Sequence, residues 1–142
     1  MDAAKLDELI RRVEFFHGLD REDVARIFSK GMTERVVKGE VIFYKGTSGN
    51  QMYVVLGGKL GVFNGEKLLA TLYPGDMFGE MALVNREPRS ATVKAVEDSL
   101  LFVLTETTFQ HLLTKRVAVQ LLLNVVRTMS KRLKESNARL TS

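Results

Sequence analysis

Between Met32 and Leu104, short stretches rich in aliphatic and β-branched residues alternate with residue pairs that favour turns. Five of these pairs contain glycine: Lys38-Gly39, Lys45-Gly46, Gly57-Gly58, Asn64-Gly65 and Pro74-Gly75. The Asn-Gly pair is the clearest hairpin signal, because both residues tolerate a positive φ. Turns at this spacing leave room only for short antiparallel strands, which pack as a small barrel or jelly roll. The segment 32–104 therefore predicts an antiparallel β-roll.

The predicted roll needs an apolar interior, and the chain has enough apolar residues for one. It contains 142 residues, of which 45% are hydrophobic, and this suits one compact domain spanning 1–142. We expect eight aliphatic residues to supply much of the interior: Val54, Leu56, Leu60, Val62, Leu69, Val93, Leu101 and Val103.

Helices are predicted on both sides of the roll. A helical lead-in over 1–31 follows from the spacing of Leu6, Leu9, Ile10, Val13 and Phe16. Asp20 is suited to cap a second helix there, and Gly31 to stop it. After the roll, Thr105 is a candidate N-cap for a helix running toward Arg116, with a longer helix behind it. The predicted fold class is therefore α+β, mainly β, with C-terminal helices over 105–142.

The last helix carries a stripe of apolar residues at alternating steps of three and four, which is typical of a coiled-coil seam. The apolar members of the stripe are Val119, Leu122, Val126, Met129, Leu133 and Leu140, and Ser136 occupies the position between the last two. This pattern predicts a homodimer formed through the C-terminal helix. The alternative is that the same stripe packs against the chain's own roll.

The segment 78–93, with the sequence FGEMALVNREPRSATV, combines features of a phosphate site. Gly79 permits a sharp turn, and the amides of the predicted helical turn from Glu80 to Leu83 would attract an anion. Pro88 favours an extended residue before it, so we expect Arg89 to enter a strand and to aim its guanidinium across the turn. The alternative is that Glu80 only complements a helix dipole and that Arg89 is an ordinary surface residue. The combination favours a pocket for a small sugar phosphate.

These same residues resemble the phosphate-binding cassette of the cyclic nucleotide-binding domain family, whose members include catabolite activator proteins, regulatory subunits of protein kinase A and cyclic-nucleotide-gated channels. The resemblance implies that Glu80 accepts the ribose 2′-hydroxyl and that Arg89 holds the cyclic phosphate. It also implies that backbone groups of Gly79, Met81, Ala82 and Ser90 complete the cradle. The ligand-binding residues expected in the cassette are Phe78, Gly79, Glu80, Met81, Ala82, Leu83, Arg89, Ser90 and Ala91.

The resemblance also implies a role for the C-terminal helix, which in catabolite activator proteins pairs two subunits and carries polar residues to the purine. It points to Arg132, Ser136 and Asn137 as contacts to the base, with the helix closing over it. Ser90 resembles the small residue of cAMP receptors, whereas threonine there is associated with cGMP-responsive channels. We therefore expect a purine cyclic mononucleotide, with cAMP preferred to cGMP. A serine hydroxyl could still bond a guanine amino group.

The residues that support catalysis are largely missing. The chain contains no cysteine, and His17 and His111 lie far apart with no metal-ligand spacing around them. Glu80 is the one acid near the presumed ligand, and a single carboxylate without a metal makes a poor phosphodiesterase. We therefore expect neither an enzyme nor a bound metal.

Charge and chain length bear on the remaining functions. The chain has a net charge of +4, and the segment after residue 114 carries seven basic residues against one acidic residue. A basic tail suggests a DNA-binding regulator. If the chain is a fragment, a further alternative is a transcription regulator or a channel-gating domain whose output domain is absent. Because the chain ends at Ser142 without room for a helix-turn-helix, we do not expect nucleic acid as a partner. A dimerisation module without a ligand is the other alternative. With no predicted membrane span or signal peptide, we expect a cytoplasmic protein.

Overall fold

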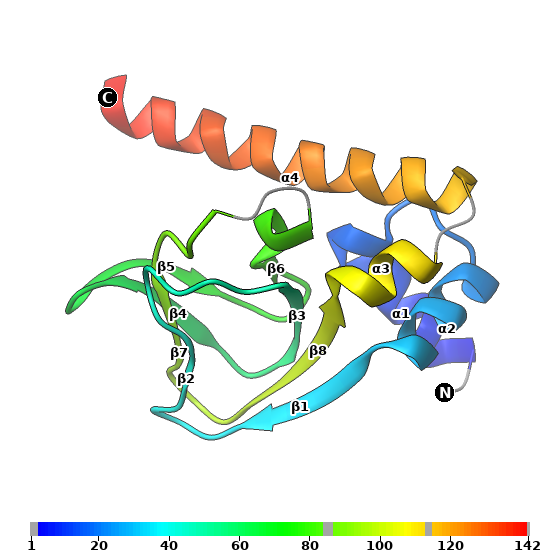
Figure 1. The fold of residues 1–142 in the computed structure, drawn as a ribbon, viewed down its shortest axis with the longest axis horizontal. Coiled ribbons are helices and arrows are strands. Elements are labelled where there is room, and N and C mark those ends of the chain that lie inside the picture. The colour runs from blue at the N-terminus through cyan, green and yellow to red at the C-terminus, as the bar shows by residue number, and fades with distance from the viewer. Residues whose placement is uncertain (1–2, 84–86, 113–114, 142) are drawn as a thin grey trace.

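The computed structural model describes residues 3–83, 87–112 and 115–141 (Figure 1). The helices are α1 (Ala3–Arg12), η1 (Glu14–Phe16), α2 (Arg21–Lys30), η2 (Glu80–Leu83), α3 (Glu106–Leu112) and α4 (Lys115–Thr141), where η marks a 3-10 helix. The strands are β1 (Met32–Val36), β2 (Val41–Phe43), β3 (Gln51–Gly57), β4 (Leu60–Asn64), β5 (Lys67–Leu72), β6 (Met77–Phe78), β7 (Thr92–Ala95) and β8 (Ser99–Thr105).

The strands form two antiparallel sheets of four strands each, in the orders β1-β8-β3-β6 and β2-β7-β4-β5. The predicted α+β class, mainly β and flanked by helices, is confirmed. In the described part of the chain the roll is made of two facing sheets and not of one closed barrel. The expected hairpin joins β4 to β5, where Asn64 pairs with Lys67 and Gly65 has a φ of 62°.

The prediction that Leu69 lies in the interior of the roll was wrong. Leu69 is 44% exposed, whereas Val54, Leu60 and Leu101 are fully buried. The pairing of β4 with β5 shifts by one residue at this point, so that Leu69 has no residue opposite it and forms a β-bulge. A bulge redirects a side chain out of the regular alternation, and no pattern in the sequence marks its position.

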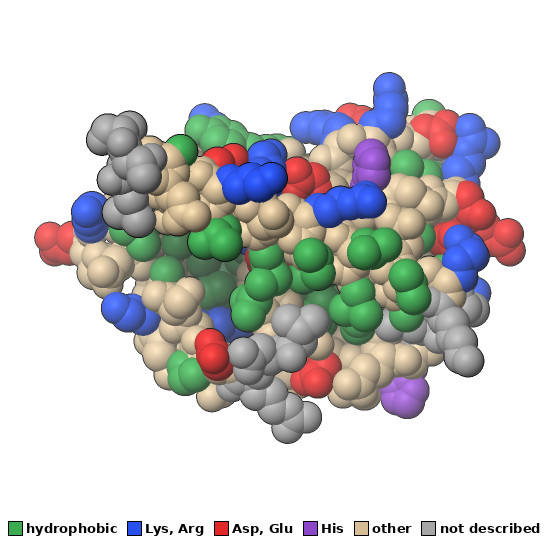
Figure 2. All heavy atoms as spheres, turned by 90° about the horizontal axis from the view of Figure 1, so that it is seen from above, with side chains coloured by type: hydrophobic (Ala, Val, Ile, Leu, Met, Phe, Trp, Pro, Cys, Tyr) green, Lys and Arg blue, Asp and Glu red, His purple; other side chains and the backbone are tan. Residues whose placement is uncertain are grey.

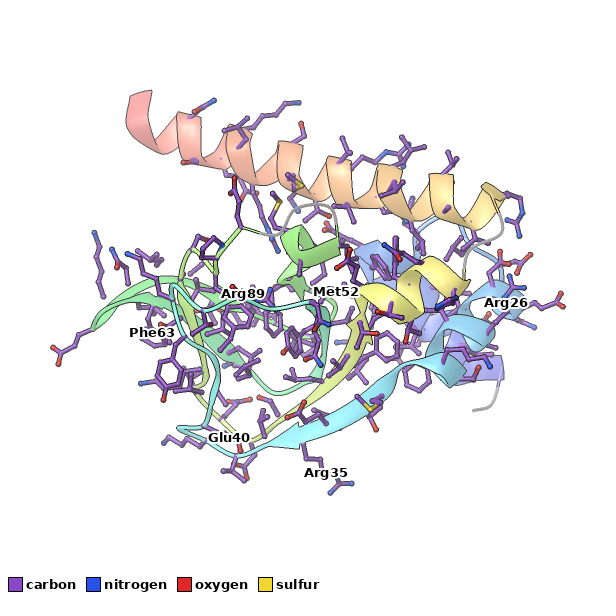
Figure 3. The ribbon with its side chains drawn as sticks, viewed as in Figure 1. Arg26, Arg35, Glu40, Met52, Phe63 and Arg89 are labelled. Carbon is purple, nitrogen blue, oxygen red and sulfur yellow. The ribbon has the colours of Figure 1, made fainter. Side chains whose placement is uncertain are left out.

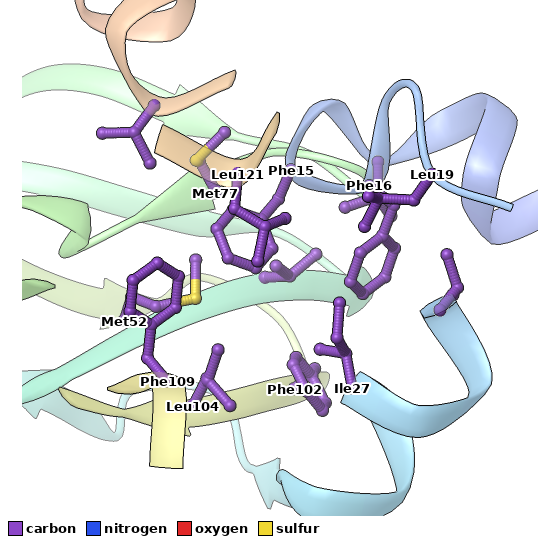
Figure 4. Packing of buried hydrophobic residues seen from close by; sticks show 14 of the residues in the cluster. Phe15, Phe16, Leu19, Ile27, Met52, Met77, Phe102, Leu104, Phe109 and Leu121 are labelled. Carbon is purple, nitrogen blue, oxygen red and sulfur yellow. The ribbon is translucent and has the colours of Figure 1, made fainter. Parts of the chain in front are cut away.

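Two apolar clusters lie on the two faces of the sheet that contains β3 and β8. Met52 and Val54 of β3 face the helices, while the alternate residues Tyr53 and Val55 face the interior of the roll. A strand that is buried on both faces reads as a continuous apolar run, as β3 does. The cluster on the helical side gathers aromatic residues from several elements (Figure 4): Phe15, Phe16, Phe102 and Phe109.

The predicted caps are present. The Asp20 carboxylate accepts a hydrogen bond from the Asp23 amide at 2.9 Å, and the Gly31 amide donates to the Ile27 carbonyl at 3.1 Å. Thr105 Oγ1 accepts from the Thr108 amide at 3.1 Å, which starts α3. In the described residues this helix is α3 (Glu106–Leu112), and α4 starts at Lys115, so the expected course from Leu112 toward Arg116 passes through residues 113–114, which lie outside the described ranges.

Helix α4 crosses the molecule above the helices α1 to α3 at one end and the roll at the other (Figure 1). One face of it is fixed to the body by the buried residues Val117, Leu121 and Val125. Asn124, which is 2% exposed, donates to the carbonyls of Phe15 at 3.0 Å and His17 at 2.8 Å. Nothing in the described ranges is a helix both long and apolar enough to cross a bilayer.

The opposite flank of α4 is apolar and faces solvent. Val119, Leu122, Val126 and Leu133 of the predicted seam are 40–62% exposed, and Figure 2, which looks onto α4, shows hydrophobic side chains gathered along it. These four residues do not cover the chain's own roll, so that alternative does not hold for them. Met129 is half-buried against the core, and the side chain of Leu140 lies outside the described residues.

Candidate ligand-binding site

The cassette begins where β6 ends. Phe78 pairs with Tyr53 of β3, and the two rings stack with centroids 4.9 Å apart and planes at 9°. Gly79 follows with a φ of 71°, a conformation that side chains of L-residues rarely adopt. The glycine therefore turns the chain from a buried strand directly into η2.

Helix η2 places its residues on different sides. Glu80 is only 5% exposed, Met81 is exposed, and Leu83 packs into the cluster on the helical side. The amide of Ala82 donates to the Gly79 carbonyl at 3.2 Å within this single 3-10 turn. The helical turn expected after Gly79 is thus present, and the Ala82 amide, expected to bind phosphate, has a partner within the protein.

Arg89 lies outside a strand, contrary to expectation, because β7 starts at Thr92. Its amide donates to the Thr47 carbonyl at 2.8 Å, which ties it to the loop before β3. Its Nη1 donates to the Gly79 carbonyl at 3.2 Å, and its Nη2 donates to the Gln51 carbonyl at 2.8 Å. Figure 3 shows Arg89 among the strands of the roll. The guanidinium therefore points across the turn toward Gly79 and away from bulk solvent.

The charge of Arg89 sits in a partly desolvated place. Burial lowers the pKa of the Arg89 guanidinium, while charges on Tyr53 and Glu80 act in the opposite direction. Its Nε atom is buried and has no hydrogen-bond partner among the described residues. A partly buried cation whose donors are incompletely satisfied favours an anionic ligand.

A cavity of about 490 Å³ opens at this point, within the range of small-molecule sites. Nine of the expected ligand-binding residues line it: Phe78, Gly79, Glu80, Met81, Ala82, Arg89, Ser90, Ala91 and Arg132. Leu83 lies in the core, and Ser136 and Asn137 are exposed on α4 beyond the cavity lining. The apolar wall opposite the cassette includes Val62, Ala70 and Leu72, which sequence reasoning did not assign to the site.

Arg132 of α4 is joined to the cassette. It donates from Nη1 to the Glu80 carboxylate and from Nη2 to the Met77 carbonyl. The carboxylate side chain is 6% exposed and the arginine side chain 42%. The structure thus brings together two residues 52 positions apart, and it places Arg132 on the acid that the resemblance assigns to the ribose. A carboxylate can accept further hydrogen bonds while it is paired with one arginine.

The cavity has charged, polar and apolar groups that can bind an anionic sugar derivative. Within the described ranges, no three histidine, cysteine, aspartate or glutamate residues are close enough to hold a metal ion. Glu80 and Glu87 are the acids that line the cavity in this part of the chain, and Glu80 is engaged by Arg132. The arrangement suits binding by charge, hydrogen bonds and apolar contact.

Comparisons with known proteins agree with this geometry. The family model described as "Cyclic nucleotide-binding domain" matches residues 33–116. The chain is 35% identical over 130 residues to the cyclic AMP receptor protein of Thermus thermophilus, covering 88% of this chain and 59% of that protein. It is 31% identical over 112 residues to the type II regulatory subunit of cAMP-dependent protein kinase of Drosophila melanogaster, covering 79% of this chain and 30% of that subunit.

A comparison of folds leads to the same group. The crystal structure of a cyclic nucleotide-binding domain from Methylobacillus flagellatus superposes with a TM-score of 0.86 at 20% identity, covering 97% of this chain and 83% of that one. This likeness confirms the expected roll with its flanking helices. The chain spans less than two thirds of the length of the two relatives above. The matched segment includes the whole cassette, and the chain belongs to the cyclic nucleotide-binding domain family.

Proposed function

We propose that this chain is a receptor for a purine cyclic mononucleotide, with cAMP preferred to cGMP. The observation that carries the proposal is the position of Arg89, whose guanidinium is held beside Gly79 in a cavity that also contains the buried Glu80. A cyclic phosphate carries one negative charge, which one arginine can bind through paired hydrogen bonds. The names of the two relatives, both of which refer to cAMP, support the same ligand class.

The rest of the ligand has matching surroundings in the same cavity. The ribose 2′-hydroxyl can donate to Glu80, which retains acceptor capacity beside Arg132. The base has an apolar wall in Val62, Ala70 and Leu72. Helix α4 already lies over the cassette through Arg132, so we propose that it closes further over the base. Such closure would bring Ser136 and Asn137, which are now exposed, toward the purine.

The proposed preference for cAMP depends on Ser90. It lines the cavity next to Arg89 and offers one small hydroxyl. Threonine at this position is associated with cGMP-responsive members of the family. The preference is tested by comparing the affinities of the wild-type chain for the two nucleotides, and tighter binding of cGMP would contradict it.

Isothermal titration calorimetry with cAMP tests the main proposal. Arg89→Ala should weaken binding at least about tenfold, because losing 1.4 kcal/mol of a charge-assisted contact has this effect. Arg35→Ala is the matched control, since Arg35 is exposed on β1 and does not line the cavity. Unchanged affinity in Arg89→Ala would refute the role of this residue. Absence of heat with any purine cyclic mononucleotide would favour a dimerisation module without a ligand.

We also propose that two copies of the chain pair through the exposed stripe on α4. Val119, Val126 and Leu133 are each about 60% exposed along α4. In a coiled coil, apolar residues with this spacing pack against a partner helix. Light scattering at rising concentration should show a dimer for the wild type and a monomer for Val126→Ser combined with Leu133→Ser. A wild type that stays monomeric at every concentration would contradict this part of the proposal.

The broader proposal is that residues 1–142 act as one regulatory unit in the cytoplasm and have no catalytic activity. The matched family is a binding domain, which supports a sensing role. Incubation with cAMP followed by chromatography of the nucleotide tests the absence of catalysis, because a phosphodiesterase would release AMP.

A further inference from the structure

The guanidinium of Arg89 is enclosed by residues that lie outside the cassette. Its Nη2 donates to the Gln51 carbonyl at 2.8 Å, and its Cζ lies 4.2 Å from the centroid of the Phe43 ring. Its backbone is held by the same region, because the Arg89 amide donates to Thr47 and the Arg89 carbonyl accepts from the Gly46 amide, both at 2.8 Å. The segment from Phe43 to Gln51 therefore holds both the main chain and the side chain of this arginine.

Within this segment, the main chain of Gly49 lies directly against the Arg89 guanidinium. A Cβ atom on Gly49 would lie 2.4 Å from Nη2, 2.8 Å from Nε and 2.9 Å from Cζ of Arg89. Gly49 does not have a positive φ, so its backbone conformation does not require glycine. What requires glycine here is the guanidinium, which lies directly against the main chain. Any larger residue would push the arginine away from this wall.

Phe43 lies against the guanidinium through the face of its ring. Its ring packs at a tilt against the stacked pair Tyr53 and Phe78, with centroid distances of 6.0 Å to each. A ring fixed in this way offers its negative face to a cation without using any N–H donor. This matters because burial lowers the pKa of the Arg89 guanidinium and leaves its Nε atom without a partner among the described residues. The aromatic face offsets part of this desolvation and leaves N–H groups available for a ligand.

We propose that Phe43 and Gly49 are positioning residues that hold Arg89 ready for an anionic phosphodiester. Neither residue needs to contact the phosphate for this role, because each acts through the guanidinium. Holding the arginine in place before binding removes the cost of ordering a long, flexible side chain when the ligand arrives. The inference rests on the proposed function, since it assigns the orientation of Arg89 to the recognition of the cyclic phosphate.

The test uses Gly49→Ala and Phe43→Leu, each with a matched control. Gly57→Ala is the control for the glycine, because Gly57 has no positive φ and a Cβ there meets nothing within 4 Å. Phe63→Leu is the control for Phe43→Leu, because the Phe63 ring lies 4.8 Å from Lys94 Nζ and is not the ring that contacts Arg89. Thermal melts of all four variants check that they fold.

The first readout is the affinity for cAMP. We expect Gly49→Ala to weaken binding about tenfold and Phe43→Leu about fivefold, with both controls and Phe43→Tyr within about twofold of the wild type. The rescue by tyrosine separates the aromatic face from simple filling of space. A wild type that binds cAMP together with unchanged affinity in Gly49→Ala and Phe43→Leu would overturn the inference.

The second readout needs no ligand and separates this inference from the proposed function. The Nε–H signal of Arg89, assigned in a ¹H–¹⁵N spectrum by its loss in Arg89→Lys, should be displaced by the Phe43 ring current. The displacement should disappear in Phe43→Leu and change in Gly49→Ala, while the two controls leave it unaltered. If the wild type binds no cyclic nucleotide, the proposed function fails and this spectrum alone decides the positioning role. A signal that none of the variants moves would refute it.

Discussion

The ion pair between Glu80 and Arg132 should be the principal tie between the outer half of α4 and the roll. Beyond Met129, α4 is exposed at every residue from 130 to 138, and Arg132 is the residue of this stretch that lines the cavity. We predict that Arg132→Gln lowers the free energy of unfolding, because it leaves the buried Glu80 carboxylate without its counter-charge.

The expected size follows from the exposure of the two side chains. Exposed ion pairs contribute about 0.2–1 kcal/mol, whereas removing one partner of a fully buried pair costs about 3–5 kcal/mol. Here the carboxylate side chain is 6% exposed and the arginine side chain 42%. We therefore expect a loss between these limits, about 1–3 kcal/mol, in line with the cost of an unsatisfied buried group. In a domain of this size each kcal/mol lowers the Tm by roughly 2–4 °C.

A double-mutant cycle separates the pair from other losses, since Arg132 also donates to the Met77 carbonyl. Glu80→Gln, Arg132→Gln and the double variant are unfolded with urea in the absence of ligand. Lys134→Gln, which removes one charge from an exposed position of the same helix, should change the stability by less than about 0.5 kcal/mol. We expect a coupling energy of about 1–2 kcal/mol, and strict additivity within about 0.5 kcal/mol would refute a stabilising pair.

Three further substitutions test other parts of the fold. Phe102→Ala should lower the free energy of unfolding by about 3–5 kcal/mol in urea titrations, because the ring is fully buried between β8 and the helices. Asn124→Ala should lower it by about 1–3 kcal/mol and increase amide exchange in η1, because the buried side-chain amide donates to the Phe15 and His17 carbonyls. Asp20→Ala should lower the Tm at pH 7 and have no effect at low pH. A hydrogen bond from the amide three residues later lowers the pKa of Asp20 below 3.8, so its contribution is present above that pH and is lost as the pH falls through the lowered value. An equal effect at both pH values would contradict this reasoning.

The parts of the fold that could be predicted are those whose causes lie within a few residues. Asp20 and Thr105 cap helices because their side chains reach amides three residues away. Gly79 takes a positive φ because the chain turns there, and the preference for glycine is local. Leu69 was misplaced because its outward direction depends on a bulge between β4 and β5, which is a property of the pair of strands and not of either sequence.

The residues of the candidate site also differ in whether their positions depend on nearby or on distant parts of the sequence. Arg89 lies only ten residues from Gly79, and its guanidinium donates to the Gly79 carbonyl across the turn, as expected. Phe43 and Gly49 reach the same arginine from a segment about forty residues earlier, and nothing in their own pattern distinguishes a ring under a cation from a ring in the core.

The position of Arg132 shows why the outer half of α4 was the hardest part to predict. Its helical periodicity could be read from the sequence, but periodicity fixes only which residues share a face. The direction in which that face points depends on how the first half of α4 docks onto the body. This docking uses the buried residues Val117 and Leu121 and the hydrogen bond from Asn124 to Phe15, which lies more than a hundred positions earlier. Once that half is fixed, Arg132 reaches Glu80 farther along the helix, and the exposed stripe lies on the other flank. A substitution that loosens the docked half should therefore disturb both the closure over the cavity and the pairing of two copies, although it touches neither surface.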